Sequence, residues 1–146
     1  MKIEIDIDEK YMDTEVVIRS NKLDGDVERL IAMMRMVNMQ IGVKHNDDTY
    51  LLDTDKILYI DTVDRKTFVY TEEETYESDF KLYEIEQELL EHDFLRISKA
   101  SIVNIKMIKS LKSEINRKIR VTLKNGEQIV VSRMYSDELR RKLGLK

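Results

Sequence analysis

Residues 94–104 read FLRISKASIVN, a stretch in which apolar and basic residues follow one another in short blocks. An apolar beginning at Phe94 is followed by Arg96-Ile97-Ser98-Lys99, which sets two cations among small side chains, and the apolar pair Ile102-Val103 comes next. A single amphipathic strand does not change character this often over so few residues. The pattern therefore predicts a strand end, an exposed basic turn and a second buried segment. Such a turn favours an anionic partner.

Charge is distributed unevenly, although the chain of 146 residues has a formal net charge of only −4. Residues 1–45 hold 7 Lys/Arg and 9 Asp/Glu, residues 46–93 hold 4 and 16, and residues 94–146 hold 14 and 4. The net charges of the three parts are therefore −2, −12 and +10. A basic third of this kind is expected of a phosphate-binding surface, because neutralised phosphates release counterions. The alternative, that acidic and basic segments pair within one fold, explains the charges equally well.

Composition excludes several classes of function. The chain has no cysteine, which rules out disulfides, thiolate catalysis and cysteine-based zinc sites. His45 and His92 lie far apart and are expected to be solvated. The glycines fit neither a phosphate-binding loop nor a nucleophile elbow, and the carboxylate pairs fall in turn-like segments. We therefore expect no enzyme activity, no cofactor or metal, and no small-molecule substrate.

No stretch of the sequence is long and apolar enough to cross a bilayer, and the N-terminus lacks the features of a signal peptide. We therefore expect a cytoplasmic protein.

Residues 1–45 predict a β-β-α extension. Isoleucines alternate with charged residues over residues 2–8, which is the pattern of a half-buried strand, and residues 15–19 predict a second strand. Asp24-Gly25-Asp26 supplies capping carboxylates for a helix whose apolar residues recur at helical spacing as far as Val37. A further strand over residues 41–44 precedes a polar turn. The sequence therefore predicts a domain boundary near residue 45.

Residues 46–146 predict a mostly β (α+β) domain. Short β-type runs separated by polar clusters occupy residues 50–52, 57–60, 67–70 and 75–76. Helices are predicted over residues 79–91 and 132–144. Asn125-Gly126 lies between two β-type runs and predicts a hairpin, because both residues tolerate a positive φ.

Basic residues recur where a predicted strand meets a loop or helix, namely at Arg65, Lys66, Arg96, Lys99 and Arg133. From such positions Arg can fork onto guanine, Lys can contact guanine or phosphate, and Ser98 can bond phosphate oxygens. Nothing in the pattern predicts a helix-turn-helix, so DNA would be read by loops. The basic third lacks the aromatic, glycine-rich strands of RNA-recognition motifs, which favours DNA over RNA.

These blocks resemble the LytTR family of DNA-binding domains. The resemblance extends over roughly residues 47–145 and rests on four separated blocks in the family's order: residues 94–104, residues 108–111, Asn125-Gly126-Glu127, and Val131-Ser132-Arg133 with Tyr135. It implies stacked antiparallel sheets with short helices. It also implies a transcriptional regulator that binds double-stranded promoter DNA through loops in successive major grooves, often at imperfect direct repeats.

The resemblance also assigns residues by position. The three reading loops would present Lys66, Lys99 and Arg133, with Arg65, Arg96 and Ser98 as helpers. Asn104 matches a recurrent family position, and its role in DNA contact or in structure stays open.

The N-terminal part departs from the response regulators of the family, because a receiver domain needs far more than 45 residues. It is similar to that of the family's short regulators, which can work beside a membrane-protein partner. Two interpretations remain: a dimerisation or sensory extension, which would give a homodimer, or a cap over a sheet edge. The competing hypothesis for the whole chain is a protein–protein signalling module without DNA binding, in which acidic residues 46–93 face a basic partner.

Overall fold

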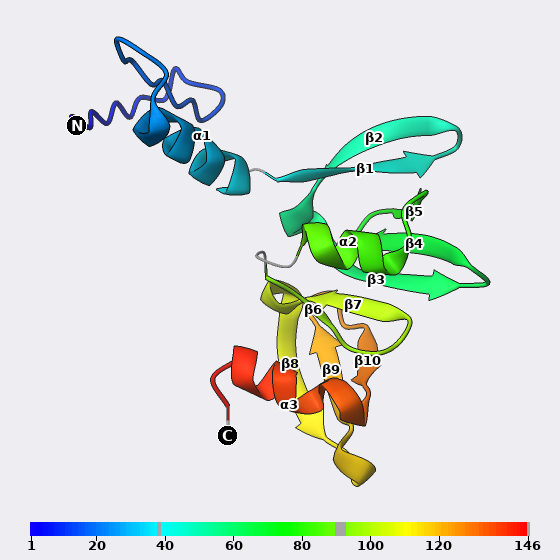
Figure 1. The fold of residues 1–146 in the computed structure, drawn as a ribbon. Coiled ribbons are helices and arrows are strands. Elements are labelled where there is room, and N and C mark those ends of the chain that lie inside the picture. Colours follow the sequence, from blue (N-terminus) through cyan, green and yellow to red (C-terminus); the bar gives the residue numbers. More distant parts are fainter. Residues whose placement is uncertain (38, 90–92, 146) are drawn as a thin grey trace. The chain divides into compact units, whose positions relative to one another are not determined.

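The computed structural model describes residues 1–37, 39–89 and 93–145, and the chain divides into two compact units, Met1–Arg35 and Met36–Lys146 (Figure 1). His92 and the end of the helix predicted over residues 79–91 lie outside the described residues. Among the helices described, none is long and apolar enough to span a membrane.

The N-terminal unit contains the start of helix α1 (Gly25–Val37) and an irregular segment before it. The carboxylate of Asp24 accepts the backbone N–H of Val27 at 3.1 Å, which confirms the predicted helix cap. The two predicted strands are wrong: residues 1–24 form no strand, and Ile3, Ile5 and Ile7 are 80%, 81% and 90% exposed. Alternation produces a half-buried strand only where other strands complete a sheet, and this unit supplies none.

A seven-stranded antiparallel sheet forms the larger part of the second unit, with the strand order β2-β1-β5-β4-β3-β7-β6. The strands are β1 (Gln40–His45), β2 (Asp48–Asp53), β3 (Ile57–Val63), β4 (Lys66–Thr71), β5 (Thr75–Ser78), β6 (Phe94–Arg96) and β7 (Ser101–Asn104). They confirm the strands predicted between residues 41 and 104. β1 pairs with β2 along its length and with β5 at Lys44 and Glu77, so residue 45 lies within a hairpin of this sheet.

A second, three-stranded antiparallel sheet has the order β10-β9-β8 and is built from β8 (Ile108–Ser113), β9 (Ile119–Leu123) and β10 (Gln128–Val131). The predicted hairpin is confirmed, since the N–H of Leu123 donates to the carbonyl of Glu127 at 2.8 Å. Of the Asn125-Gly126 pair, Gly126 alone takes a positive φ, of 91°. The connection is therefore a three-residue loop with a left-handed glycine instead of the two-residue turn that the pair suggested.

The two faces of the seven-stranded sheet bury two different apolar clusters, which confirms the stacked-sheet architecture. On one face, Ile60 and Ile102 pack with Ile85 of helix α2 (Leu82–Glu88). On the other face, Val103 packs with residues of β9 and with Leu139 of helix α3 (Arg133–Lys142). The neighbours Ile102 and Val103 enter opposite clusters, as the two-residue period of a strand requires. Each fully buried aliphatic side chain contributes about 1.5–3 kcal/mol.

Candidate nucleic-acid interface

The first basic loop is the β3–β4 turn, in which Val63 pairs with Lys66 across two residues. Asp64 and Arg65 have φ values of 51° and 66°, so both central residues are left-handed. This is the type I′ geometry, which matches the twist of the flanking strands but normally selects Asn-Gly. The turn fixes the hairpin tip, where Arg65 and Lys66 are both exposed.

The second basic loop joins β6 to β7 and presents Lys99 as an exposed side chain. Ile97 is 1% exposed and belongs to the cluster that includes Leu139, so its side chain fixes the base of the loop. The N–H of Ile97 donates to the carbonyl of Ser101 at 3.0 Å, and the N–H of Ala100 donates to the hydroxyl of Ser98 at 3.1 Å. The turn therefore has a defined shape without any ligand.

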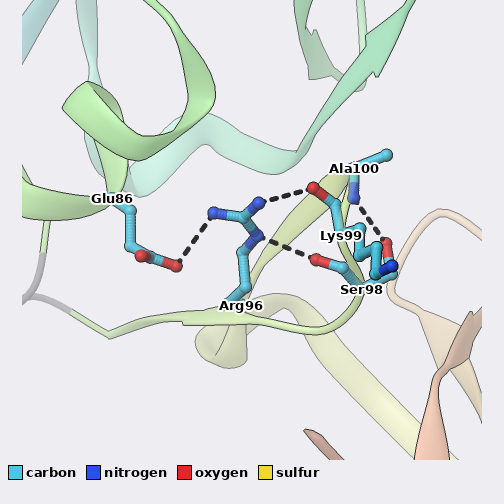
Figure 2. Close-up of polar contacts among 5 residues, drawn as sticks. All are labelled: Glu86, Arg96, Ser98, Lys99 and Ala100. Carbon is cyan, nitrogen blue, oxygen red and sulfur yellow. Dashed lines mark hydrogen bonds and ion pairs between the residues drawn. The ribbon is translucent and has the colours of Figure 1, made fainter. Parts of the chain in front are cut away.

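Arg96 points into this second loop, as Figure 2 shows. Its Nε donates to the carbonyl oxygen of Ser98 at 2.8 Å, and its Nη2 donates to the carbonyl oxygen of Lys99. Its Nη1 lies 3.3 Å from the carboxylate of Glu86 in α2. Arg96 and Ser98, two of the six predicted DNA-binding residues, thus both have polar groups engaged within the protein.

The third basic loop is the junction between β10 and α3, where Arg133 is the first residue of the helix and is exposed. Ser132 precedes it with extended backbone angles of φ −68° and ψ 154°. Helix α3 itself, over Arg133–Lys142, confirms the predicted final helix.

Hydrogen bonds hold the three loops beside one another. The N–H of Thr62 at the end of β3 donates to the carbonyl of Ala100 at 2.8 Å. On the other side of the second loop, the N–H of Ser132 donates to the carbonyl of Ile97 at 2.9 Å. The β3–β4 hairpin, the β6–β7 loop and the start of α3 lie along the right-hand side of this unit in Figure 1.

The three loops therefore form one basic surface. We define the three-loop surface by its exposed cations, Arg65, Lys66, Lys99 and Arg133. Within the described ranges, none of these four side chains takes part in an ion pair.

Sequence reasoning missed a further cation beside this surface, Lys118. It is exposed and directly precedes β9. Ile119 pairs with Val131, so Lys118 lies beside the residues that lead into α3. The signal was present in the sequence: the Asn125-Gly126 hairpin places the start of β9 opposite the end of β10.

Acidic side chains gather at the far end of β4 from the three-loop surface. Asp47 lies in the β1–β2 turn and Asp48 begins β2, and the β4–β5 turn carries three glutamates at residues 72–74. His45 Nε2 lies 3.6 Å from Glu74 Oε2, which places the two turns side by side. In the part of the chain that the structure describes, only the pairs Arg96–Glu86 and Lys106–Asp93 join the acidic middle to the basic third. Internal pairing thus does not account for the charge asymmetry.

Asn104 has a structural role. It is 1% exposed, its Nδ2 donates to the carbonyl of Ile57 at 2.9 Å, and its Oδ1 accepts the N–H of Lys106 at 3.1 Å. The side chain therefore joins the end of β7 to the start of β3 inside the protein.

A tyrosine pair supports the same sheet from its second face. The rings of Tyr59 and Tyr70 stack with centroids 4.4 Å apart, across β3 and β4. Burial raises the pKa of Tyr59, and the neighbouring carboxylate of Glu127 raises this pKa further. Because Glu127 follows the β9–β10 loop, the small sheet lies beside the large one at this point.

The fold and the site together define a domain of stacked antiparallel sheets that presents basic residues on loops. The family model described as the LytTr DNA-binding domain matches residues 47–144. The chain belongs to the LytTr DNA-binding domain family.

Individual relatives agree with this assignment. The sensory transduction protein LytT of Bacillus subtilis (strain 168) is 30% identical over 104 residues, which are 71% of this chain but only 43% of LytT. A Staphylococcus aureus (strain MSSA476) protein named as an HTH-type transcriptional regulator is 26% identical over 147 residues and covers 99% of both chains. A solved LytTr DNA-binding domain from Bacillus cereus superposes with a TM-score of 0.68 at 29% identity, over 73% of this chain and 97% of that one.

The name of the Staphylococcus aureus relative includes a helix-turn-helix, which needs two helices joined by a tight turn. In the described part of this chain, five strands separate α1 from α2 and five more separate α2 from α3. The three helices therefore do not form that motif.

Proposed function

We propose that this chain is a transcriptional regulator that binds double-stranded DNA through the three-loop surface. The observation that carries the proposal is the pair of backbone hydrogen bonds, Thr62 to Ala100 and Ser132 to Ile97, that fix three cationic loops beside one another. A surface arranged before binding loses less conformational entropy when it binds. Family membership supports DNA as the ligand.

In this proposal Lys66, Lys99 and Arg133 contact bases or phosphates, and Arg65 assists at the hairpin tip. The loops, and not a helix, enter the major groove, because α3 presents only its first residue to the three-loop surface. Arg133 suits a guanine, because its guanidinium can bond O6 and N7 together. Neighbouring loops reach successive grooves of one duplex, which fits recognition of direct repeats in a promoter.

The acidic turns support the same orientation. Asp47, Asp48 and the glutamates at residues 72–74 lie at the far end of β4, where they are kept from the phosphates. The field of such an asymmetric domain turns its basic end towards DNA during approach.

Fluorescence anisotropy tests the proposal with a labelled duplex from the region upstream of the chain's own gene, titrated at several salt concentrations. We expect tight binding at low salt that weakens steeply as salt rises, and weaker binding to a shuffled duplex of equal length. Absence of binding at low salt, together with a stable complex with another protein, would instead support the signalling-module hypothesis.

We further propose that the N-terminal unit joins two copies of the chain. Its isoleucines at positions 3, 5 and 7 are at least 80% exposed, and Leu23, Val27 and Ile31 help to line an open groove in the same unit. Below about 40 residues a unit rarely buries enough surface to be stable alone, and oligomerisation is a common solution.

Sedimentation velocity at increasing concentration tests the dimer. We expect a reversible dimer that Ile5→Lys abolishes, while Ile115→Lys preserves it, because Ile115 is similarly exposed (84%) but belongs to the other unit. A wild-type chain that remains monomeric at all concentrations would contradict the dimer, and co-purification of that monomer with a membrane protein would favour a sensory role.

A further inference from the structure

We infer that Arg96 is a positioning residue: it clamps the second basic loop from inside and so presents Lys99 to DNA without touching DNA itself. The inference rests on the proposed function for the identity of the ligand. The clamp itself is a property of the free protein. It gives Arg96 a different role from the DNA contact that its place in the basic stretch suggested.

Every carbonyl oxygen of residues 97–100 accepts a hydrogen bond from the protein. The carbonyl of Ile97 accepts the N–H of Ser132, and that of Ala100 accepts the N–H of Thr62. Among the described residues, no backbone N–H donates to the two carbonyls between them, those of Ser98 and Lys99. Arg96 supplies both missing donors, Nε to Ser98 and Nη2 to Lys99. The clamp thus completes the bonding of the loop (Figure 2).

This arrangement has an electrostatic consequence. A carbonyl oxygen carries partial negative charge and would repel a phosphate, so an anion-binding loop must turn its carbonyls away from the ligand. All four are held by protein donors, which leaves the ammonium group of Lys99 exposed at the surface. Within the described residues the N–H of Lys99 has no acceptor either, so it is a second donor available to a phosphate.

The clamp requires an arginine. A guanidinium is a rigid planar fork that can bond two acceptors and an ion partner at once, whereas an ammonium is a point charge on a flexible stem. Here Nη1, the third guanidinium nitrogen, also lies 3.3 Å from the Glu86 carboxylate, so the side chain is held to α2 as well.

The surroundings of Arg96 argue against a direct contact with DNA. Its side chain is 21% exposed, and its three kinds of nitrogen all have protein partners. The neighbouring carboxylate of Glu86 balances its charge and would repel a phosphate that came close enough to reach Arg96.

Salt dependence of DNA binding distinguishes the two roles. We expect Arg96→Ala to weaken binding about tenfold, the equivalent of one hydrogen bond to a charged group, with the slope of log affinity against log salt unchanged. Lys99→Ala should weaken binding and also reduce that slope by about one. Arg96→Lys keeps the charge but cannot hold both carbonyls, so it should bind like Arg96→Ala.

Amide hydrogen exchange on the free protein tests the clamp without DNA. Exchange at the hydrogen-bonded amides of Ile97, Ser98 and Ala100 should accelerate at least fivefold in Arg96→Ala and in Arg96→Lys, and should stay at the wild-type rate in Lys99→Ala. Wild-type exchange in both Arg96 variants would overturn the clamp. A slope reduced by about one in Arg96→Ala, with Arg96→Lys binding like the wild type, would show a direct phosphate contact and overturn the inference.

Failure of the proposed function gives a different result. If none of the alanine variants of Lys66, Lys99 and Arg133 changes DNA binding, the three-loop surface is not the DNA site. The exchange experiment still decides whether Arg96 clamps the loop.

Discussion

The backbone N–H of Ser132 donates to the carbonyl oxygen of Ile97 at 2.9 Å, and this bond joins the second and third loops of the three-loop surface. The two residues are far apart in sequence, and they meet because the small sheet and α3 cover the second face of the large sheet. Lys99 and Arg133 each lie close in sequence to one end of this bond. The spacing of the two cations thus depends on the packing of the whole domain.

Ser132→Pro should remove this bond while keeping the backbone conformation of residue 132. The φ of Ser132 is −68°, which proline also adopts, but proline has no N–H and its ring would approach the Ile97 carbonyl. We expect a loss of about 1–3 kcal/mol in the free energy of unfolding and weaker DNA binding. Ser132→Ala keeps the backbone N–H, and the hydroxyl that it removes makes no capping hydrogen bond. The free energy of unfolding of this control should therefore stay within about 0.5 kcal/mol of the wild-type value. Equal stability of the two variants in urea unfolding would contradict the role of the bond.

Arg65→Gly should separate stability from function at the hairpin tip. Arg65 has a φ of 66°, which costs a residue with a β-carbon about 1 kcal/mol relative to glycine. The glycine variant should therefore unfold at higher urea concentration while binding DNA more weakly. Arg65→Ala should lose the same affinity without the gain in stability. If the glycine variant is less stable than the alanine variant, the left-handed turn is not the source of strain.

Asn104→Ala should destabilise the domain by about 1–3 kcal/mol, because it leaves the Ile57 carbonyl and the Lys106 N–H without their buried partner. Asn125→Ala is the control, since the Asn125 side chain bonds the N–H of Glu127 at an exposed turn where water can replace it. We expect the slope of DNA affinity against salt to be unchanged in both. A slope reduced by about one in a stable Asn104→Ala protein would show that Asn104 contacts phosphate.

Tyr59 should make stability fall at alkaline pH. Its pKa is raised by burial and by the Glu127 carboxylate, so the neutral phenol is favoured in the folded state. This stability is fully present below the pKa of an unfolded tyrosine, near 10, and is lost as pH rises towards the higher folded value. The difference in unfolding free energy between wild type and Tyr59→Phe should therefore change between pH 9 and pH 11, about one unit either side of that value. A constant difference across this interval would contradict the raised pKa.

Much of the second unit could be predicted from local pattern. The continuous apolar run at residues 57–60 identifies a strand buried on both faces, and the alternation from Ile119 identifies a strand buried on one face. Asn125-Gly126 identifies a hairpin through glycine's freedom at positive φ. Local pattern marks Arg65, Lys66, Arg96, Lys99 and Arg133 alike as cations at strand ends. The resemblance to the LytTR family was needed to select Lys66, Lys99 and Arg133 among them.

Other features depend on information that is not local. The isoleucines at positions 3, 5 and 7 show the same alternation as a true strand, but no second strand in their unit covers them. Lys118 comes near Arg133 only through the register of β9 and β10. Arg96 lies next to the basic turn in sequence, but its side chain points into the turn because the Ser98 and Lys99 carbonyls face it. The direction of those carbonyls does not follow from the local pattern.

The most direct test of the three-loop surface compares Lys66→Ala/Lys99→Ala/Arg133→Ala with Lys56→Ala by anisotropy over a range of salt. Lys56 is exposed in the short turn that precedes β3, at the opposite end of that strand from the hairpin tip. We predict that the triple variant loses at least about a hundredfold in affinity and that its salt slope falls by about one for each phosphate contact removed, while Lys56→Ala behaves like the wild type. A folded triple variant that keeps the wild-type affinity and slope would contradict the account.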